Sequence, residues 1–148
     1  MSAAAKERPL TGDLRPDGAA LSLQEYEAAG GYSAIRTALG KMSPAGVTEL
    51  VKASNLRGRG GAGFPTGVKW ALVPMGADAP KPKYLVVNAD EMEPGTFKDR
   101  LLLEGNPHQL IEGVILASFA IQAETSYIFL RGEYTVAEER LLRAIDEA

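Results

Sequence analysis

Two polar loops hold the residues best suited to chemistry. The first, residues 57–67, reads Arg-Gly-Arg-Gly-Gly-Ala-Gly-Phe-Pro-Thr-Gly and is called the glycine loop. Glycine allows backbone conformations closed to other residues and lets a ligand lie against bare N–H groups. Four cations and no acid lie between Lys52 and Trp70. The loop therefore suits a phosphate or an electron-rich planar ring, and Phe64 offers a stacking surface for an aromatic ligand. A flexible linker rich in Arg and Gly is the structural alternative, which Phe64 and Trp70 disfavour.

The spacing of the loop's glycines imitates a nucleotide-binding motif that we exclude. Gly58-x-Gly60-x-x-Gly63 has the form of the dinucleotide fingerprint. That fingerprint needs a strand before its first glycine and a helix opening at its last. Here a helical pattern precedes the loop, and Phe64-Pro65 follows Gly63. The phosphate loop of nucleotide triphosphatases is excluded as well, because it requires Lys and Ser or Thr after that glycine.

The second polar loop is acidic and directly follows a short apolar run at residues 84–87. Residues 88–95 read Asn-Ala-Asp-Glu-Met-Glu-Pro-Gly and are called the acidic loop. In open α/β sheets, ligands bind beyond the carboxyl ends of strands, which places this loop well. Neighbouring carboxylates repel one another, which suggests that they accept hydrogen bonds or bind a cation. The spacing of these carboxylates matches no metal-binding signature. We predict no metal site. A solvated acidic turn is the alternative, disfavoured because the two loops are expected to face one another across a cleft.

The elements that must position these loops follow from capping and periodicity. Ser22 and Glu25 form a capping box, and Ser43-Pro44 supplies an N-cap followed by proline at the first helical position. We predict helices from Ser22 to Gly30-Gly31, over residues 32–39 and 44–55, a helical turn over 68–73, a helix after Asn106-Pro107 that buries residues 111–121, and a last helix from residue 135. Strands are expected at residues 84–87 and 126–130.

The order of these elements predicts an α/β fold. Strand, helix, strand and helix with short connections are typical of an open, Rossmann-like parallel sheet with helices packed on it. Two strands do not sustain a sheet domain alone, so we interpret residues 22–148 as part of a larger domain, after a flexible arm over residues 1–21. The continuous apolar run at residues 84–87 predicts a strand buried on both faces. Three aromatic residues, Trp70, Tyr127 and Phe129, are assigned to the core, and His108, the only histidine, to packing or capping.

Composition narrows the function classes. The 148 residues include no cysteine and have a formal net charge of −3. Disulfides, thiolate catalysis, Cys-ligated zinc and Cys-ligated iron–sulfur clusters are therefore excluded from this chain. Mild acidity argues against a nucleic-acid surface. The chain has no apolar run of about 18 residues and no transit peptide, so we expect a cytoplasmic protein without membrane insertion.

Both loops and three shorter motifs resemble a known family. The motifs are Asn106-Pro-His108, Leu110-Ile-Glu-Gly113 and Arg131-Gly-Glu-Tyr134. Together with the loops they closely resemble the NADH-oxidising flavoprotein subunit of respiratory complex I. The same module occurs in diaphorase subunits of NAD-reducing hydrogenases and NAD-dependent formate dehydrogenases. The resemblance runs from about Leu23 to the C-terminus. It implies part of an FMN-binding domain in which NADH gives a hydride to FMN and electrons then pass to iron–sulfur clusters, towards quinone in complex I.

The resemblance also implies roles for single residues. Glu93 would orient the nicotinamide and so serve catalysis, and Phe64 would stack on the adenine of NADH. The implied FMN contacts are Gly58, Arg59, Gly60, Gly61, Gly63, Lys69, Asn88, Asp90 and Glu91. Implied partners are a thioredoxin-like [2Fe–2S] subunit and other peripheral-arm subunits, on the cytoplasmic face of the inner membrane.

The chain departs from the family in several places. Leu72 stands where an aromatic residue is frequent, Met92 where Gly or Ser is usual, and Val87 where Cys is often found. The family's second flavin-contacting stretch, its β-grasp region and its [4Fe–4S] helical bundle have no counterpart here. We therefore expect the isolated chain to retain little flavin and to be inactive. Two alternatives remain: a separate binding or assembly module without turnover, and an anionic-nucleotide binder without a redox role.

Overall fold

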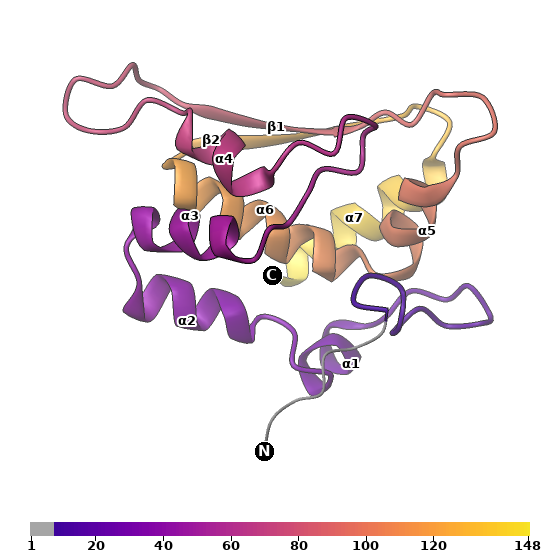
Figure 1. The fold of residues 1–148 in the computed structure, drawn as a ribbon. Coiled ribbons are helices and arrows are strands. Elements are labelled where there is room, and N and C mark those ends of the chain that lie inside the picture. The colour runs from indigo at the N-terminus through magenta and orange to yellow at the C-terminus, as the bar shows by residue number, and fades with distance from the viewer. Residues whose placement is uncertain (1–7) are drawn as a thin grey trace. The chain divides into compact units, whose positions relative to one another are not determined.

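The computed structural model describes residues 8–148, which form seven helices and two strands. Figure 1 shows them in chain order. Their bounds are α1 Leu23–Ala28, α2 Ser33–Lys41, α3 Pro44–Ala53, α4 Thr66–Ala71, β1 Tyr84–Ala89, α5 Lys98–Gly105, α6 Pro107–Ile121, β2 Thr125–Leu130 and α7 Thr135–Glu147. Within these residues no helix combines the length and the apolar character needed to cross a membrane.

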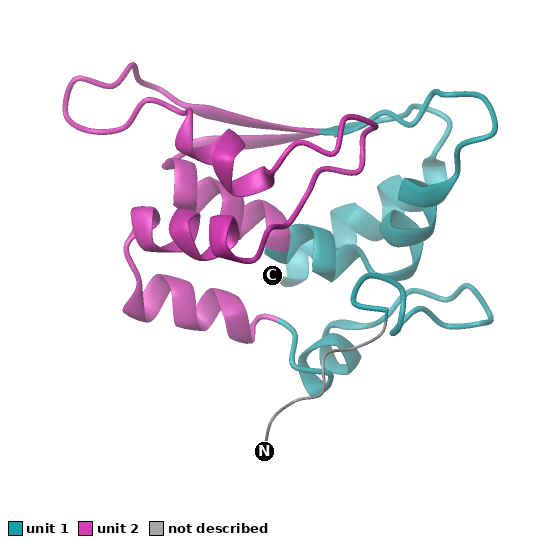
Figure 2. Ribbon diagram, viewed as in Figure 1, with its two compact units in different colours: residues 1–31, 88–112, 129–148 teal, residues 32–87, 113–128 magenta. Residues whose placement is uncertain are grey.

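The chain divides into two compact units, coloured separately in Figure 2. Of the described residues, unit 1 comprises 8–31, 88–112 and 129–148, and unit 2 comprises 32–87 and 113–128. The boundary passes through β1, α6 and β2. The glycine loop therefore belongs to unit 2 and the acidic loop to unit 1.

The core of unit 2 lies where three helices meet. Ala38 of α2, Val47 of α3 and Ala120 of α6 are buried together, and Trp70 of α4 packs against them. This confirms the prediction that Trp70 is a core residue. The helices α3 and α4 pack closely together. The glycine loop connects them, so both of its ends are held at this core.

Unit 1 is built on the pairing of α5 with α7. Leu103 of α5 and the α7 residues Ala137, Leu141 and Ala144 are buried. The small alanines let the α7 backbone approach its neighbours. The three α7 residues follow one another at spacings of four and three, which places them on one face of the helix. The acidic loop leads directly into α5.

Several helix starts follow the local rules of capping. Ser22 and Glu25 form the predicted capping box of α1. The hydroxyl of Ser43 accepts the Gly46 N–H at 3.1 Å, and Pro44 occupies the first turn of α3, as predicted. The carboxamide oxygen of Asn106 accepts the Gln109 N–H at 3.3 Å at the start of α6. The helix predicted at residues 68–73 begins earlier, at Thr66, because Pro65 acts as its N-cap with an extended ψ of 120°.

The two strands pair in parallel and α6 lies between them in the chain, which confirms the expected α/β class. The Glu124 N–H donates to the Lys83 carbonyl at one end of β2, over 2.9 Å. The hydroxyls of Ser118 on α6 and Ser126 on β2 lie 2.7 Å apart, so one face of β2 packs on α6.

The opposite face of the sheet corrects two predictions. Tyr84 and Val86 of β1 are 54% and 62% exposed, and Tyr127 and Phe129 of β2 are 55% and 60% exposed. The strand at residues 84–87 is therefore not buried on both faces, and Tyr127 and Phe129 are not core residues. The physical reason is the alternation of side chains along a strand: packing on α6 covers one set and leaves the other set in solvent.

The segment predicted to be a flexible arm is described only from Arg8 onward. Leu21 donates its N–H to the Gly105 carbonyl over 3.0 Å, and the Gln109 side chain donates to the Pro9 carbonyl over 3.2 Å. Arg15 pairs with Glu25 of α1 at 3.0 Å. Residues 8–21 thus contact the helices of unit 1, and residues 1–7 lie outside the described residues.

Candidate functional site

The glycine loop is closed at its base by hydrogen bonds within unit 2. Arg57 and Pro65 form an antiparallel bridge. The Gly58 N–H donates to the Phe64 carbonyl over 2.9 Å, and the Thr66 N–H donates to the Leu56 carbonyl over 2.8 Å. The structure thus makes the segment a closed loop between α3 and α4, with a helix rather than a strand before it. This confirms that Gly58-x-Gly60-x-x-Gly63 is not a dinucleotide fingerprint.

The glycines of this loop meet different demands. Gly61 and Gly63 have φ angles of +124° and +61°, which non-glycine residues rarely adopt. Gly60 has no such backbone requirement, and a Cβ built on it meets nothing within 4 Å. Neither conformation nor packing therefore explains Gly60 within residues 8–148. A bare backbone that opens on free space suits the close approach of a ligand.

The side chains of the loop add charge and an aromatic surface. Arg59 and Lys69 are exposed, and Phe64 is 48% exposed. In the described part of the chain, the N–H groups of Gly60, Gly61 and Gly63 form no hydrogen bond with the protein. Free N–H groups beside cationic side chains make an environment that favours an anionic or electron-rich ligand.

The acidic loop of unit 1 is shaped by two local turns. The carboxamide oxygen of Asn88 accepts the Asp90 N–H at 3.0 Å. The Thr96 N–H donates to the Glu93 carbonyl over 3.0 Å, and Gly95 has a φ of +80°. Proline at the second position and a positive φ at the third define a type II turn. The sequence Glu93-Pro-Gly-Thr96 itself predicts this turn, because it has proline at the second position and glycine at the third. The turn leaves Glu93 exposed.

Glu91, unlike its acidic neighbours, points into the protein. Its side chain is 2% exposed. Oε1 accepts the Asp99 N–H at 2.9 Å, and Oε2 accepts the Arg100 N–H at 3.2 Å. These are N–H groups of the first turn of α5, whose own N-cap residue, Phe97, forms no side-chain cap. The Glu91 carboxylate therefore caps α5 from a separate segment and complements the positive end of its dipole.

Tyr134 completes the surroundings of Glu91. Its hydroxyl donates to Glu91 Oε2 over 3.0 Å. Burial acts to raise the pKa of the Glu91 carboxyl, but the N–H groups of Asp99 and Arg100, the Tyr134 hydroxyl and the charge of Lys98 outweigh it. The pKa of Glu91 consequently lies below its ordinary value. Burial, followed by the hydrogen bond to Glu91, raises the pKa of Tyr134.

The other acidic residues do not gather around Glu91. Within residues 8–148, no three His, Asp or Glu side chains lie where they could hold a metal ion together. Asp90 is half-buried and Glu93 is exposed, whereas Glu91 is buried. The acidic loop thus separates its carboxylates, one into the protein and one into solvent. The predicted cleft between the two loops stays a prediction.

His108 is packed in unit 1. It is 1% exposed, its Nε2 lies 3.1 Å from Glu147 Oε2, and its ring stacks on Tyr26 with centroids 5.8 Å apart. These contacts confirm the prediction of a packing residue. None of them involves either loop.

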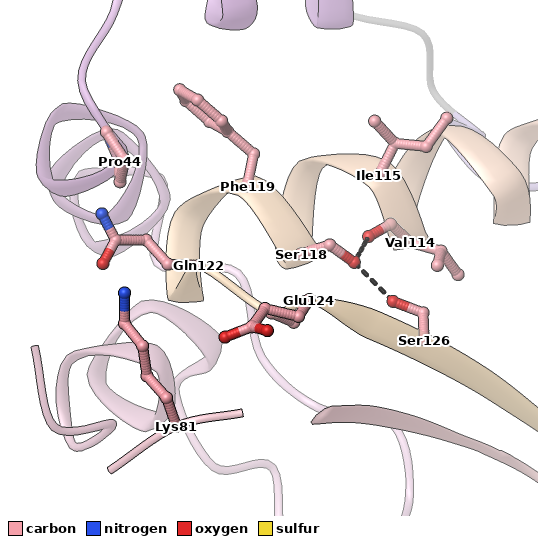
Figure 3. A pocket seen from close by; sticks show the side chains of 10 residues that line it. Pro44, Lys81, Val114, Ile115, Ser118, Phe119, Gln122, Glu124 and Ser126 are labelled. Atoms are coloured by element: carbon pink, nitrogen blue, oxygen red, sulfur yellow. Dashed lines mark hydrogen bonds between the residues drawn. The ribbon is translucent and has the colours of Figure 1, made fainter. Parts of the chain in front are cut away.

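An open hollow of about 1010 Å³ in unit 2 contains none of the predicted site residues. Figure 3 shows that it lies beside the end of α6, where Ser118, Phe119, Gln122 and Ser126 contribute to its lining. The Ser118 hydroxyl is already bonded to the Val114 carbonyl at 2.7 Å and to Ser126. Because neither polar loop contributes to this hollow, we base no function on it.

The structure adds two residues that sequence reasoning did not place near the site. Arg131 and Tyr134 contact Glu91, although they lie about forty residues further along the chain. The signal available in the sequence was the motif Arg131-Gly-Glu-Tyr134 at the end of the second strand. In a parallel sheet the loops after neighbouring strands emerge at the same edge, so this rule could have placed the motif close to the acidic loop.

Comparisons with known proteins show what the chain is similar to. The family model described as the Nuo51 FMN-binding domain, Complex1_51K, matches residues 51–148. An F subunit of NADH-quinone oxidoreductase from Rhizobium meliloti (strain 1021) is 61% identical over 133 residues, which are 90% of this chain and 31% of that protein. The F subunit of the same enzyme from Escherichia coli (strain K12) is 51% identical over 140 residues, 95% of this chain and 31% of that protein.

A solved structure with the same fold is an NAD+-reducing [NiFe]-hydrogenase in the H2-reduced state. Its TM-score is 0.70 at 38% identity, and the match covers 88% of this chain and 22% of the hydrogenase chain. The present chain therefore spans about a third of the length of the curated relatives and less than a quarter of that hydrogenase chain.

Proposed function

Because the chain belongs to the family of the Nuo51 FMN-binding domain, as the resemblance of its two loops predicted, we propose that it forms part of the FMN and NADH site of an NADH:acceptor oxidoreductase. Gly60 is the observation that supports this most directly. Its missing side chain is explained neither by φ nor by packing, and its N–H, in a loop that contains cationic groups, has no partner among the described residues. A flavin lying against the loop would supply the missing explanation.

The residues present fit FMN in chemistry. The phosphate of FMN is an anion, and the glycine loop offers N–H donors and exposed cations to it. The ribityl chain carries hydroxyl groups. The carboxylate and amide oxygens of the acidic loop are suited to accept hydrogen bonds from these hydroxyls. The proposed FMN contacts are Gly58, Arg59, Gly60, Gly61, Gly63, Lys69, Asn88, Asp90 and Glu91. Because the Glu91 carboxylate caps α5 and accepts from Tyr134, Glu91 is proposed to contact FMN through its backbone.

Two residues are proposed to serve NADH. Phe64 is exposed and offers its ring to the adenine, while Glu93 projects into solvent and accepts hydrogen bonds from the nicotinamide carboxamide. When bound, FMN supplies the acceptor for the hydride of NADH and releases electrons singly. The contribution of this chain is to hold and orient the two nucleotides, because hydride transfer depends on alignment of the reacting rings.

The assembly to which the chain contributes is also a proposal. The two relatives that are F subunits of NADH-quinone oxidoreductase share 61% and 51% identity with it, against 38% for the hydrogenase. These identities favour a quinone-reducing complex over a diaphorase of a hydrogenase. We propose an iron–sulfur partner, a thioredoxin-like [2Fe–2S] subunit, to receive the electrons, other peripheral-arm subunits beside it, and a location on the cytoplasmic face of the membrane.

The test compares two glycines at which an added methyl group meets no neighbour. Gly60→Ala adds a methyl group to the glycine loop, and Gly40→Ala adds one to α2, where it also meets nothing within 4 Å. We expect Gly60→Ala to weaken FMN binding at least fivefold without lowering the unfolding temperature, and Gly40→Ala to leave FMN affinity unchanged. Because we expect the purified chain to hold little flavin, affinity is measured by titrating FMN and following its fluorescence. Equal affinities for the two variants, or no FMN binding by the unaltered chain, would contradict the proposal.

A further inference from the structure

The acidic loop is anchored at one residue, Glu91, by both its side chain and its backbone. The side chain caps α5 through the N–H groups of Asp99 and Arg100, as described above. The backbone carbonyl of Glu91 accepts Arg131 Nη1 at 2.6 Å. A residue held at both its carboxylate and its carbonyl has little freedom to rotate, and neither do the peptide planes beside it.

The anchor is supplied from the segment between β2 and α7. Arg131 is also hydrogen-bonded through its backbone: its N–H donates to the Ala89 carbonyl over 3.3 Å. The Tyr134 N–H donates to the Arg131 carbonyl over 3.0 Å. The two residues that contact Glu91 are therefore fixed to each other and to the end of β1, all within unit 1.

Tyr134 is itself held in place by two cations. The guanidinium groups of Arg100 and Arg131 lie 5.7 and 5.5 Å from the centre of its ring. Both distances are within the range of cation–π attraction. Tyr134 is 8% exposed, so its hydroxyl has Glu91 as a fixed acceptor in an environment that contains little water.

The residues proposed to contact the nucleotides lie on either side of this anchor. Asp90 precedes Glu91 directly, and Glu93 follows it by two positions, before the type II turn. The local bonds of the loop, from Asn88 to Asp90 and across the turn, set its curvature but not its direction. Direction comes from the contacts of Glu91 with the rest of unit 1.

We propose that Tyr134 and Arg131 are positioning residues, which hold the acidic loop through Glu91 so that Asp90 and Glu93 are presented to the bound nucleotides. The proposal rests on the proposed function for its ligand. Its structural part, that the loop loses order without Tyr134 and Arg131, is independent of any ligand.

The first measurement is made on the full chain without FMN. Tyr134→Phe removes only the hydroxyl, and Tyr127→Phe is the matched control at an exposed site on β2. We expect NMR order parameters of the Asp90, Met92 and Glu93 amides to fall in Tyr134→Phe and to stay unchanged in Tyr127→Phe. Arg131→Lys, which keeps the charge but loses the planar donor, is expected to act in the same direction. Unchanged order parameters in both loop variants would overturn the inference.

The second measurement is the FMN titration of the same chains. We expect a three- to tenfold rise in Kd for Tyr134→Phe and no change for Tyr127→Phe. Loss of loop order with an unchanged Kd would also overturn the positioning role. If the unaltered chain takes no FMN, the proposed function fails and the role towards nucleotides fails with it. That outcome is distinguishable from failure of the anchor itself, because loop order is measured without ligand.

Discussion

Gly67 at the start of α4 packs against the backbone of Lys52 in α3, so closely that a Cβ on Gly67 would lie 2.4 Å from the Lys52 nitrogen. Backbone atoms cannot move aside as a flexible side chain can. The last glycine of the glycine loop is therefore required by helix packing, whereas Gly60 is not. One glycine-rich segment thus contains residues that serve the fold and residues free to serve a ligand.

We predict from this contact that Gly67→Ala destabilises the chain. The added methyl group must push α4 away from α3, which is expected to cost about 2 kcal/mol. Urea unfolding followed by circular dichroism measures the change, with Gly40→Ala as the control because its methyl group meets no neighbour. A Gly67→Ala chain as stable as the unaltered one would show that α3 and α4 are not packed in this way.

Glu93 provides a prediction about the nicotinamide nucleotide. Its side chain is exposed, so Glu93→Ala is expected to change stability by less than about 0.5 kcal/mol. Loss of a hydrogen bond to the carboxamide is expected to weaken NADH binding about tenfold, with FMN affinity within twofold. Titration of NADH into the FMN-loaded chain without oxygen tests this, and Glu139→Ala on α7 is the exposed control. Unchanged NADH affinity in Glu93→Ala would remove the assigned role.

Glu91 makes stability depend on pH in a defined direction. Its pKa in the folded chain lies below the ordinary value near 4.5, so the folded state favours the ionised form. This stabilising effect is fully present above about pH 4.5 and is lost as the pH falls through the folded-state pKa. We therefore predict that the unfolding temperature drops over this acid range, and that it drops less in Glu91→Gln, which has no charge to lose there. Thermal unfolding at a series of pH values measures the difference. Parallel curves for both chains would mean that other carboxylates dominate the acid transition.

Much of the local structure was predictable because it depends on residues a few positions apart. The capping box of Ser22 and Glu25 and the turn at residues 93–96 are formed by neighbours in the chain. The same holds for the exclusion of a dinucleotide fingerprint, which required only the order of a helix and a loop. Each of these predictions used a hydrogen bond or an element order that is visible within one short window of sequence.

The errors have a common physical cause. The apolar character of residues 84–87 and of Tyr127 and Phe129 indicated strands, but not which face would be covered. Covering a sheet face depends on helices that pack on it from elsewhere, and α6 covers only one face. Apolar residues on the other face then remain exposed, because an apolar side chain is buried only where another segment packs against it.

By itself, the sequence determined the family, the α/β class and the two loops, because motifs and periodicity are properties of residue order. Only the tertiary structure decided which of the loop residues are engaged in contacts within the protein. Glu91 and Gly67 look, in sequence, like their neighbours Glu93 and Gly60. They differ because α5 and Tyr134 surround Glu91, and α3 lies against Gly67, and such contacts depend on where distant segments pack.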